Sequence, residues 1–383
     1  MAEPVVGGWC DPAFGLLREE FTANFAERGE LGAAVCVFVR GAVVADLWGG
    51  WSDAARQQRW TADTLVNVFS VGKGLLAACI VRLTGQGLID PDAIVARYWP
   101  EFAARGKTAV TVRQLLSHQA GVPAIRRPLA LGSALDWSLM TRVLADEEPW
   151  WPPGSGHGYH VNTFGFAVGE LIRRVTGMTP GTLLQRELAG PLTADVHIGL
   201  AASQHGRVGE FLWGQVPAAD DAPSGPAGDT EMAARAYANP PDFSGFGVVN
   251  TAAWRSAEIP STNAHATASG VARFYAALAG GGTLDGCRVV DGSALAAAVE
   301  EQAYGEDLVL RRPSRFGLGF QLTHPERPLG RGPGCFGHFG AGGSVGFCDP
   351  DAGLAFGYVT NQMGPRWRNP RNRALMDACY ACL

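Results

Sequence analysis

The sequence predicts an α+β protein in which one antiparallel sheet is built from both ends of the chain and a mainly helical segment is inserted between them. Three observations support this fold class. Runs rich in β-branched residues occur near both ends, apolar residues at helical spacing fill the middle, and the 383 residues are 47% hydrophobic and only 17% charged. We expect a sheet domain from residues 1–70 and 280–383, a mainly helical domain from residues 71–279, and an active site between them.

The N-terminal part predicts a helix followed by strands. Apolar side chains recur at helical spacing after Asp11-Pro12, which indicates an amphipathic helix that ends near Gly29. Two β-rich runs, 33–39 and 42–48, are separated by Arg40-Gly41, a hairpin signal. A further strand leads toward Ser70.

The middle of the chain predicts helices, and the last third predicts strands again. Residues 201–262 are rich in Gly, Pro, Ala and Asp, which indicates long surface loops with a short strand or two. The predicted helices are 71–84, 111–117, 133–146, 162–176, 180–188 and 268–279, and the predicted later strands are 287–290, 316–322, 344–348 and 354–360, before a closing helix over 371–383.

Composition excludes several classes of protein. A net charge of −5 with a pI near 5.9 gives no reason to expect nucleic acid as a partner. The arginine-rich stretch 365–373 is interpreted as a solvated connection. The N-terminal residues lack a signal-peptide pattern, and no apolar run has membrane-spanning length, so we expect a cytoplasmic protein without a membrane partner. The sequence sets no expectation for the oligomeric state.

The eight cysteines mostly lie in apolar runs, which indicates reduced thiols in the core rather than a disulfide framework. Cys379 and Cys382 form a C-x-x-C pair, but they lie on a predicted terminal helix, outside a redox or zinc context. His157 and His160 have H-x-x-H spacing without accompanying carboxylates or cysteines. We therefore expect no metal and no cofactor.

Ser70 and Lys73 form the most informative pair of residues. Ser70 lies between a strand and an apolar helix, where unpaired N–H groups and the helix dipole favour negative charge. Lys73 follows one helical turn later. Only two of the 31 Lys and Arg residues are lysines, Lys73 and Lys107, and lysine, unlike arginine, can give up its proton when desolvated. The pair therefore predicts a nucleophile with a proton acceptor; the alternative is a helix cap beside a solvated lysine.

Two further polar segments complete a set of motifs. Tyr159 lies in the loop 155–162, just before a predicted helix, and the glycine-rich segment 336–344 precedes or begins a strand. Ser70-Val71-Gly72-Lys73, then Tyr159, then His338-Phe339-Gly340, in this order, resemble the serine β-lactamase and penicillin-binding-protein-like superfamily. Segments 87–91 and 112–121 are similar to stretches of that superfamily.

The resemblance is closest to the class C-like esterases called family VIII carboxylesterases, and it implies a β-lactamase-like fold. It also implies hydrolysis of short- to medium-chain carboxylic esters through an acyl-enzyme on Ser70, with Lys73 and Tyr159 moving the proton. By resemblance, the N–H groups of Ser70 and Ala341 form the oxyanion hole. Which of Lys73 and Tyr159 is the immediate base stays open.

The chain departs from class C β-lactamases at two motifs. The residue two positions after Tyr159 is Val161 rather than asparagine, with Asn162 displaced by one, and the third motif begins with His338 rather than lysine. Both changes remove groups that hold the amide and carboxylate of a β-lactam, which favours an uncharged ester. The predicted substrate-binding residues are His338, Gly340, Trp151, His160 and Asn162, although Trp151 equally fits packing at the domain junction.

Four alternatives remain at this stage. Ser344 lies in a G-x-S-x-G match at 342–346, but that motif requires a strand before the serine and a helix after it. A β-lactamase or D-Ala-D-Ala peptidase, or a transacylase, would use the same three residues. A non-catalytic scaffold that binds acyl ligands would normally have lost one of them.

Overall fold

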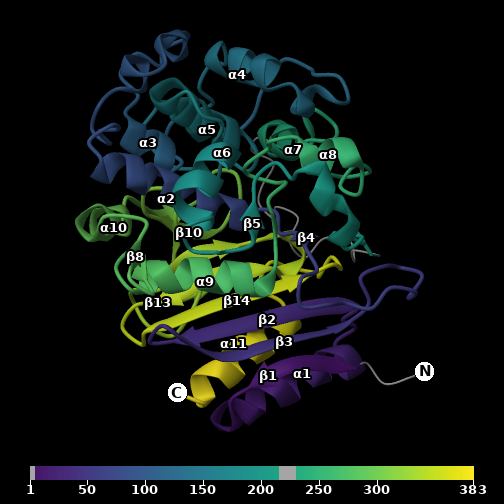
Figure 1. Cartoon of the computed structure of the whole chain (residues 1–383). Coiled ribbons are helices and arrows are strands. Elements are labelled where there is room, and N and C mark those ends of the chain that lie inside the picture. The colour runs from purple at the N-terminus through teal and green to yellow at the C-terminus, as the bar shows by residue number, and fades with distance from the viewer. Residues whose placement is uncertain (1–4, 215–229) are drawn as a thin grey trace.

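A nine-stranded antiparallel sheet crosses the lower half of the molecule and combines strands from both ends of the chain (Figure 1). The computed structural model describes residues 5–214 and 230–383. The strands are β1 (Val6–Cys10), β2 (Gly32–Val39), β3 (Ala42–Gly50), β9 (Ala303–Glu306), β10 (Pro313–Phe316), β11 (Gln321–Leu322), β12 (Phe336–Phe339), β13 (Val345–Asp349) and β14 (Leu354–Thr360). Their order is β1-β3-β2-β14-β13-β12-β11-β10-β9. The central pair, β2 with β14, joins the two ends of the chain.

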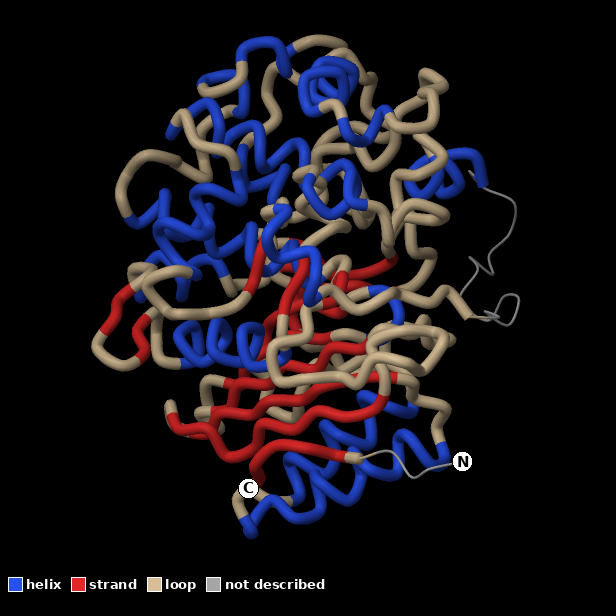
Figure 2. The backbone as a smooth tube through the Cα atoms, turned by 45° about the vertical axis from the view of Figure 1, so that its right-hand side comes forward, coloured by secondary structure: helices blue, strands red, loops and turns tan. Residues whose placement is uncertain are grey.

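Both faces of this sheet are covered, because side chains that alternate along each strand are apolar on both sides. In β2, Val35 packs in the core shared with α1 (Gly15–Glu27) and α11 (Pro370–Ala381). Its neighbour Cys36 lies in the other core, which α9 (Ala268–Ala279) shares. Figures 1 and 2 show α1 and α11 together below the sheet, and the helical part of the chain above it.

The helical part surrounds α2 (Val71–Gly85), which follows Ser70. Almost every side chain of α2 is buried, as expected for a helix that is apolar on all sides. The other helices of this part are α3 (Val112–Leu116), α4 (Trp137–Ala145), α5 (Thr163–Thr176), α6 (Pro180–Leu184), α7 (Thr230–Ala238), α8 (Ala252–Ser256) and α10 (Gly292–Ala298). Two small sheets contain β4 (Val66–Asn67), β5 (Val196–His197) and β6 (His265–Ala266), and β7 (Thr283–Leu284) and β8 (Cys287–Arg288).

The predicted fold class is confirmed, and the main differences occur where glycine or proline interrupts a pattern. The expected strand 316–322 is two strands, since Gly319 has a φ of +85° and turns the chain between β10 and β11. Strand β1 was not predicted, because Gly7 and Gly8 interrupt the alternation of apolar and polar residues that indicates a strand. Within 201–262, where loops with short strands were expected, the described residues instead contain α7 and α8; residues 215–229 lie outside the described residues.

All strands of the large sheet come from outside residues 71–279, whereas α9, near the end of that range, packs on the sheet. The exact division into two domains stays a prediction. Among the described residues, no helix combines the length and apolar character needed to cross a membrane.

Candidate active site

Ser70 lies at the N-terminus of α2, directly after a strained backbone position. Phe69 has a φ of +48°, a left-handed conformation that is rare for a residue with a side chain. The Phe69 ring is held by edge-to-face contacts with Phe211 and Trp213, at centroid distances of 4.8 and 5.9 Å. The sharp turn therefore ends β4 and starts α2 within a few residues, and it places Ser70 at the helix start.

Lys73 is fully buried, with 0% of its surface exposed, which excludes the solvated lysine that the sequence left as an alternative. Its Nζ lies 3.0 Å from Ser70 Oγ and donates a hydrogen bond to the carbonyl oxygen of Ser261 at 3.1 Å. Both partners are neutral. Burial lowers the pKa of Lys73 well below its ordinary value of 10.5, because the charged form loses its hydration. Burial therefore shifts the equilibrium of Lys73 toward the unprotonated amine beside Ser70.

Tyr159 lies beside Lys73, whose Nζ is 4.8 Å from the centre of the tyrosine ring. Burial raises the pKa of Tyr159 well above 10, and a hydrogen bond with the Ser70 side chain offsets this only partly. Tyr159 is therefore a protonated phenol at neutral pH. The structure thus brings together the three residues that the sequence predicted as catalytic.

His338, on β12, takes the place of the lysine expected in the third motif. Its Nδ1 lies 2.6 Å from the carbonyl oxygen of Phe339, which only accepts, so Nδ1 carries the proton. The Nε2 lone pair then faces the Tyr159 hydroxyl at 3.4 Å. Burial, followed by the nearby Lys73, lowers the pKa of His338 to about 3. The imidazole is neutral at neutral pH, so this position carries no cation.

The two residues whose N–H groups were predicted to form the oxyanion hole each begin a helical turn. Ser70 begins α2, and Ala341 begins a single 3₁₀ turn, Ala341–Gly343, that follows β12. Neither N–H donates to an acceptor within the described ranges. Gly340 lies against the strand that leads to Ser70: a Cβ at Gly340 would clash with the carbonyl oxygen of Val68. Glycine is therefore required here because it lets β12 approach the nucleophile closely.

The turn that carries Ala341 is held from beneath by α11. The side chains of Arg371 and Asn369 both donate to the carbonyl oxygen of Gly342, at 3.2 and 3.1 Å, and Asn372 donates to that of Gly343 at 2.8 Å. Arg371 is almost fully buried, so the interpretation of 365–373 as a solvated connection is wrong at this residue. The arginine pattern alone did not reveal the buried Glu30 carboxylate that pairs with Arg371.

Trp367, from the same segment, forms part of the wall of the site. Its ring packs edge-on against Tyr159 at 5.5 Å, and the guanidinium of Arg312 lies 4.9 Å from its centre. No local pattern singles out Trp367, since its partner Tyr159 is distant in the chain. A half-buried aromatic ring at this place is suited to contact an apolar substrate.

Three of the predicted substrate-binding residues have protein partners instead. His160 accepts from the Val122 N–H at 3.0 Å through Nε2 and binds the Gly158 carbonyl at 2.7 Å through Nδ1. Asn162 is bonded on both sides of its amide, with the carbonyl of Ala236 and the hydroxyls of Ser244 and Thr262 as partners. Trp151 is buried and packs edge-on against His160, while its indole N–H meets no acceptor among the described residues. Hydrogen bonding therefore favours a supporting role behind Tyr159 for His160 and Asn162, and packing favours it for Trp151.

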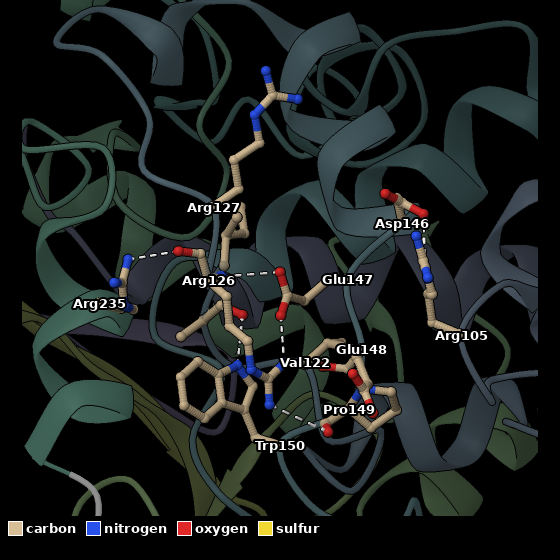
Figure 3. A network of polar contacts seen from close by, with 12 residues as sticks. Arg105, Val122, Arg126, Arg127, Asp146, Glu147, Glu148, Pro149, Trp150 and Arg235 are labelled. Carbon is tan, nitrogen blue, oxygen red and sulfur yellow. Dashed lines mark hydrogen bonds and ion pairs between the residues drawn. The ribbon is translucent and has the colours of Figure 1, made fainter.

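The segment before Trp151 is fixed by Arg126, as Figure 3 shows. The Arg126 guanidinium lies 3.8 Å above the Trp150 ring and donates to Glu147, while the Trp150 Nε1–H donates to the Ala124 carbonyl at 2.9 Å. Arg235 of α7 donates to the Arg126 carbonyl at 2.7 Å. These contacts hold the loop that leads into the Tyr159 segment.

Ser344 does not occupy a nucleophile elbow. It follows the turn at 341–343 and precedes strand β13, and its buried Oγ accepts the Thr360 N–H at 3.3 Å. His157 and His160 bind separate partners, and no group of three or more metal-ligating side chains occurs within the described residues. All eight cysteines are free thiols.

Comparison with known proteins identifies the family of this chain. The protein-family model described as Beta-lactamase matches residues 17–380. The chain is 36% identical over 371 residues to "Esterase/beta-lactamase LipL" of Mycobacterium tuberculosis, covering 94% of this chain and 83% of the relative.

Two solved structures superpose over nearly the whole chain. One is a family VIII carboxylesterase, with 40% identity, a TM-score of 0.91, and coverage of 99% of this chain and 100% of the other. The second is a penicillin-binding protein homologue from Caulobacter crescentus, with 40% identity, a TM-score of 0.92 and the same coverage. The predicted superfamily and the prediction of a hydrolytic enzyme are confirmed. From a match that spans nearly all of its length, we conclude that this chain belongs to the beta-lactamase family.

Proposed function

We propose that this protein is a serine carboxylesterase that hydrolyses short- to medium-chain carboxylic esters through an acyl-enzyme on Ser70. The observation that carries the proposal is the buried Lys73 amine, 3.0 Å from Ser70 Oγ. Its neutral surroundings favour the unprotonated form, which is the form that can accept a proton from serine. The names of a relative and of a solved structure, an esterase/β-lactamase and a carboxylesterase, support the same reaction class.

In the first step, Ser70 Oγ attacks the ester carbonyl carbon and its proton passes to Lys73 Nζ. The opposite pKa shifts of Lys73 and Tyr159 favour Lys73 as the base and Tyr159 as the acid. The oxyanion forms between the N–H groups of Ser70 and Ala341; one such donor is typically worth about 3 kcal/mol.

The tetrahedral intermediate then collapses. The bond to the leaving alcohol breaks, the Tyr159 hydroxyl gives its proton to the alkoxide, and protonated Lys73 restores the proton to Tyr159. Water next attacks the acyl-enzyme and loses a proton to Lys73. Ser70 leaves with a proton returned through the same pair, and the carboxylic acid is released.

An uncharged ester fits the third motif better than a β-lactam does. The neutral His338, bonded to Phe339 and facing Tyr159, offers no cation to the carboxylate that β-lactams carry. Trp367 adds an apolar wall beside Tyr159. We therefore propose His338, Gly340 and Trp367 as the residues nearest the bound ester.

The test is hydrolysis of p-nitrophenyl esters of increasing chain length, and of a chromogenic cephalosporin, by the wild type, Ser70→Ala and Ser344→Ala. We expect ester turnover to be lost only in Ser70→Ala, and the cephalosporin to be cleaved slowly or not at all. Loss of activity in Ser344→Ala, or faster cleavage of the cephalosporin than of every ester, would contradict the proposal.

A further inference from the structure

Asp307 contacts the backbone of the proposed acid Tyr159 from a distant part of the chain. Asp307 lies at the tip of the β9–β10 hairpin, with 0% of its surface exposed. The N–H of Tyr159 donates to both oxygens of its carboxylate, at 3.0 and 3.1 Å. Three further donors converge on the same carboxylate: the N–H groups of Val309 and Leu310, at 2.9 and 2.8 Å, and the Ser314 hydroxyl at 2.8 Å.

This carboxylate bridges two segments. Val309, Leu310 and Ser314 belong to the hairpin, whereas Tyr159 belongs to the loop before α5. The oxygens of an ionised carboxylate act only as hydrogen-bond acceptors. Four donors converge on them here, so the arrangement suits a buried carboxylate that is fully hydrogen-bonded. Asp307 thus shapes the hairpin tip and ties it to Tyr159.

The same hairpin also packs against the Tyr159 loop, through one backbone hydrogen bond and through apolar contacts. The Leu308 N–H donates to the His157 carbonyl at 3.0 Å. A Cβ added at Gly158 would lie 2.8 Å from the Trp151 ring and 3.0 Å from Val309 Cγ2. Glycine at position 158 therefore allows the hairpin tip and the loop to pack closely.

The aromatic ring of Tyr159 is held by the hairpin as well. Phe316 of β10 stacks on it, with an interplanar angle of 3° and a centroid distance of 5.9 Å. The hairpin therefore fixes Tyr159 at two points, the backbone N–H through Asp307 and the ring through Phe316. With both fixed, little freedom remains in the direction of the hydroxyl.

We propose that Asp307 is a positioning residue for ester hydrolysis, which holds the Tyr159 hydroxyl at the distance from Ser70 and Lys73 that proton transfer requires. This inference rests on the proposed function. Asp307 touches neither substrate nor reacting atoms in this role; it acts through Tyr159. Burial is the main cause of the raised pKa of Tyr159, and the nearby charge of Asp307 adds to it in the same direction.

The test compares Asp307→Asn with a matched control, Asp349→Asn. Asp349 is equally buried and also accepts backbone N–H groups and a hydroxyl at a hairpin, from Gly332, Ala352 and Tyr380. It lies at the end of β13 opposite the 341–343 turn. Both substitutions disturb a hairpin, but only Asp307→Asn changes the support of Tyr159.

We expect Asp307→Asn to lower kcat by about tenfold to hundredfold, since small displacements of catalytic groups have costs of this size. KM should stay within about threefold, and the alkaline limb of the kcat profile should move to lower pH. Asp349→Asn should keep kcat after correction for the folded fraction, which circular dichroism measures. An unchanged kcat in Asp307→Asn, or equal losses in the two variants, would overturn the inference.

Labelling of Ser70 by a fluorophosphonate probe separates this inference from the proposed function. If the wild type neither labels nor hydrolyses esters, the proposed function fails. If it does both, and Asp307→Asn matches it, only the role of Asp307 fails. Should Asp307→Asn not fold, Ser314→Ala removes one hydroxyl donor to the carboxylate; kcat should then fall about threefold to tenfold, and an unchanged kcat would overturn the inference.

Discussion

Arg371 donates to the Glu30 carboxylate at 2.8 Å, and both side chains are almost completely withdrawn from solvent. The pair joins α11 to the residues just before strand β2, and the second arm of the guanidinium reaches the Gly342 carbonyl. Tyr358 and Thr360 donate their hydroxyls to the same carboxylate. The turn that carries Ala341 is therefore anchored in the core rather than at the surface.

Arg371→Met should destabilise the protein strongly, because Glu30 would remain buried without its cationic partner. The expected loss is about 3–5 kcal/mol in the free energy of unfolding, measured by urea denaturation. The double variant Glu30→Gln with Arg371→Met should recover part of it. If the double variant is less stable than Arg371→Met, the unpaired charge is not the cause.

Lys73→Arg should lower ester turnover strongly, because arginine stays protonated and cannot accept the proton of Ser70 as the neutral lysine amine does. We expect a decrease of about 10²–10⁴-fold in kcat, measured with a p-nitrophenyl ester. Lys107→Arg is the matched control, since Lys107 is the only other lysine, is equally buried, and donates to the Ala104 carbonyl at 2.9 Å. Equal losses in both variants would show that burial of an arginine, not the lost base, explains the effect.

The pH profile of kcat/KM should reach its plateau far below pH 10.5. Burial lowers the pKa of Lys73, so the active, unprotonated amine forms as the pH rises through this lowered value. Burial raises the pKa of Tyr159, so no loss from tyrosine ionisation is expected up to about pH 10. Initial rates between about pH 5 and about pH 10 check this. A rate that is negligible at pH 7 and rises only near pH 10 would show that Lys73 is protonated in the free enzyme.

Gly340→Ala should reduce kcat strongly and the free energy of unfolding moderately. The added methyl group would clash with the Val68 carbonyl, which moves β12 and the Ala341 N–H away from Ser70. We expect kcat to fall about 10²-fold, the cost of losing one oxyanion donor, and unfolding free energy to fall by about 1–3 kcal/mol. Gly15→Ala, where a Cβ meets nothing within 4 Å, is the control. Wild-type kcat in Gly340→Ala would refute the proposed close approach.

The sequence predicted the parts of the site that depend on local spacing. Ser70 and Lys73 lie one helical turn apart, so the helix itself brings them together. Strands β2 and β14 were predicted because both are β-rich apolar runs next to hairpin signals, and nearly all of their residues are buried. The order of the three motifs supplied Tyr159, whose position relative to Ser70 no local pattern fixes.

Other parts of the site depend on contacts between distant residues, and these were missed. Tyr159 and Asp307 are 148 positions apart, and an isolated aspartate in a hairpin carries no signal of its partner. The arginine side chains around Arg371 were expected to be solvated, because Glu30, the partner of Arg371, lies at the other end of the chain. His160 and Asn162 were selected as substrate contacts because they adjoin Tyr159, but burial turns their polar atoms toward the protein.

Burial of Lys73 and Lys107 has a consequence for chemical modification of the protein. Both lysines of the chain have 0% exposed surface. Amine-directed reagents, such as succinimidyl esters and lysine-specific cross-linkers, therefore find no lysine side chain on the folded molecule. Unfolding exposes two, so incorporation of such a label at lysine, followed by mass spectrometry, reports the unfolded fraction directly.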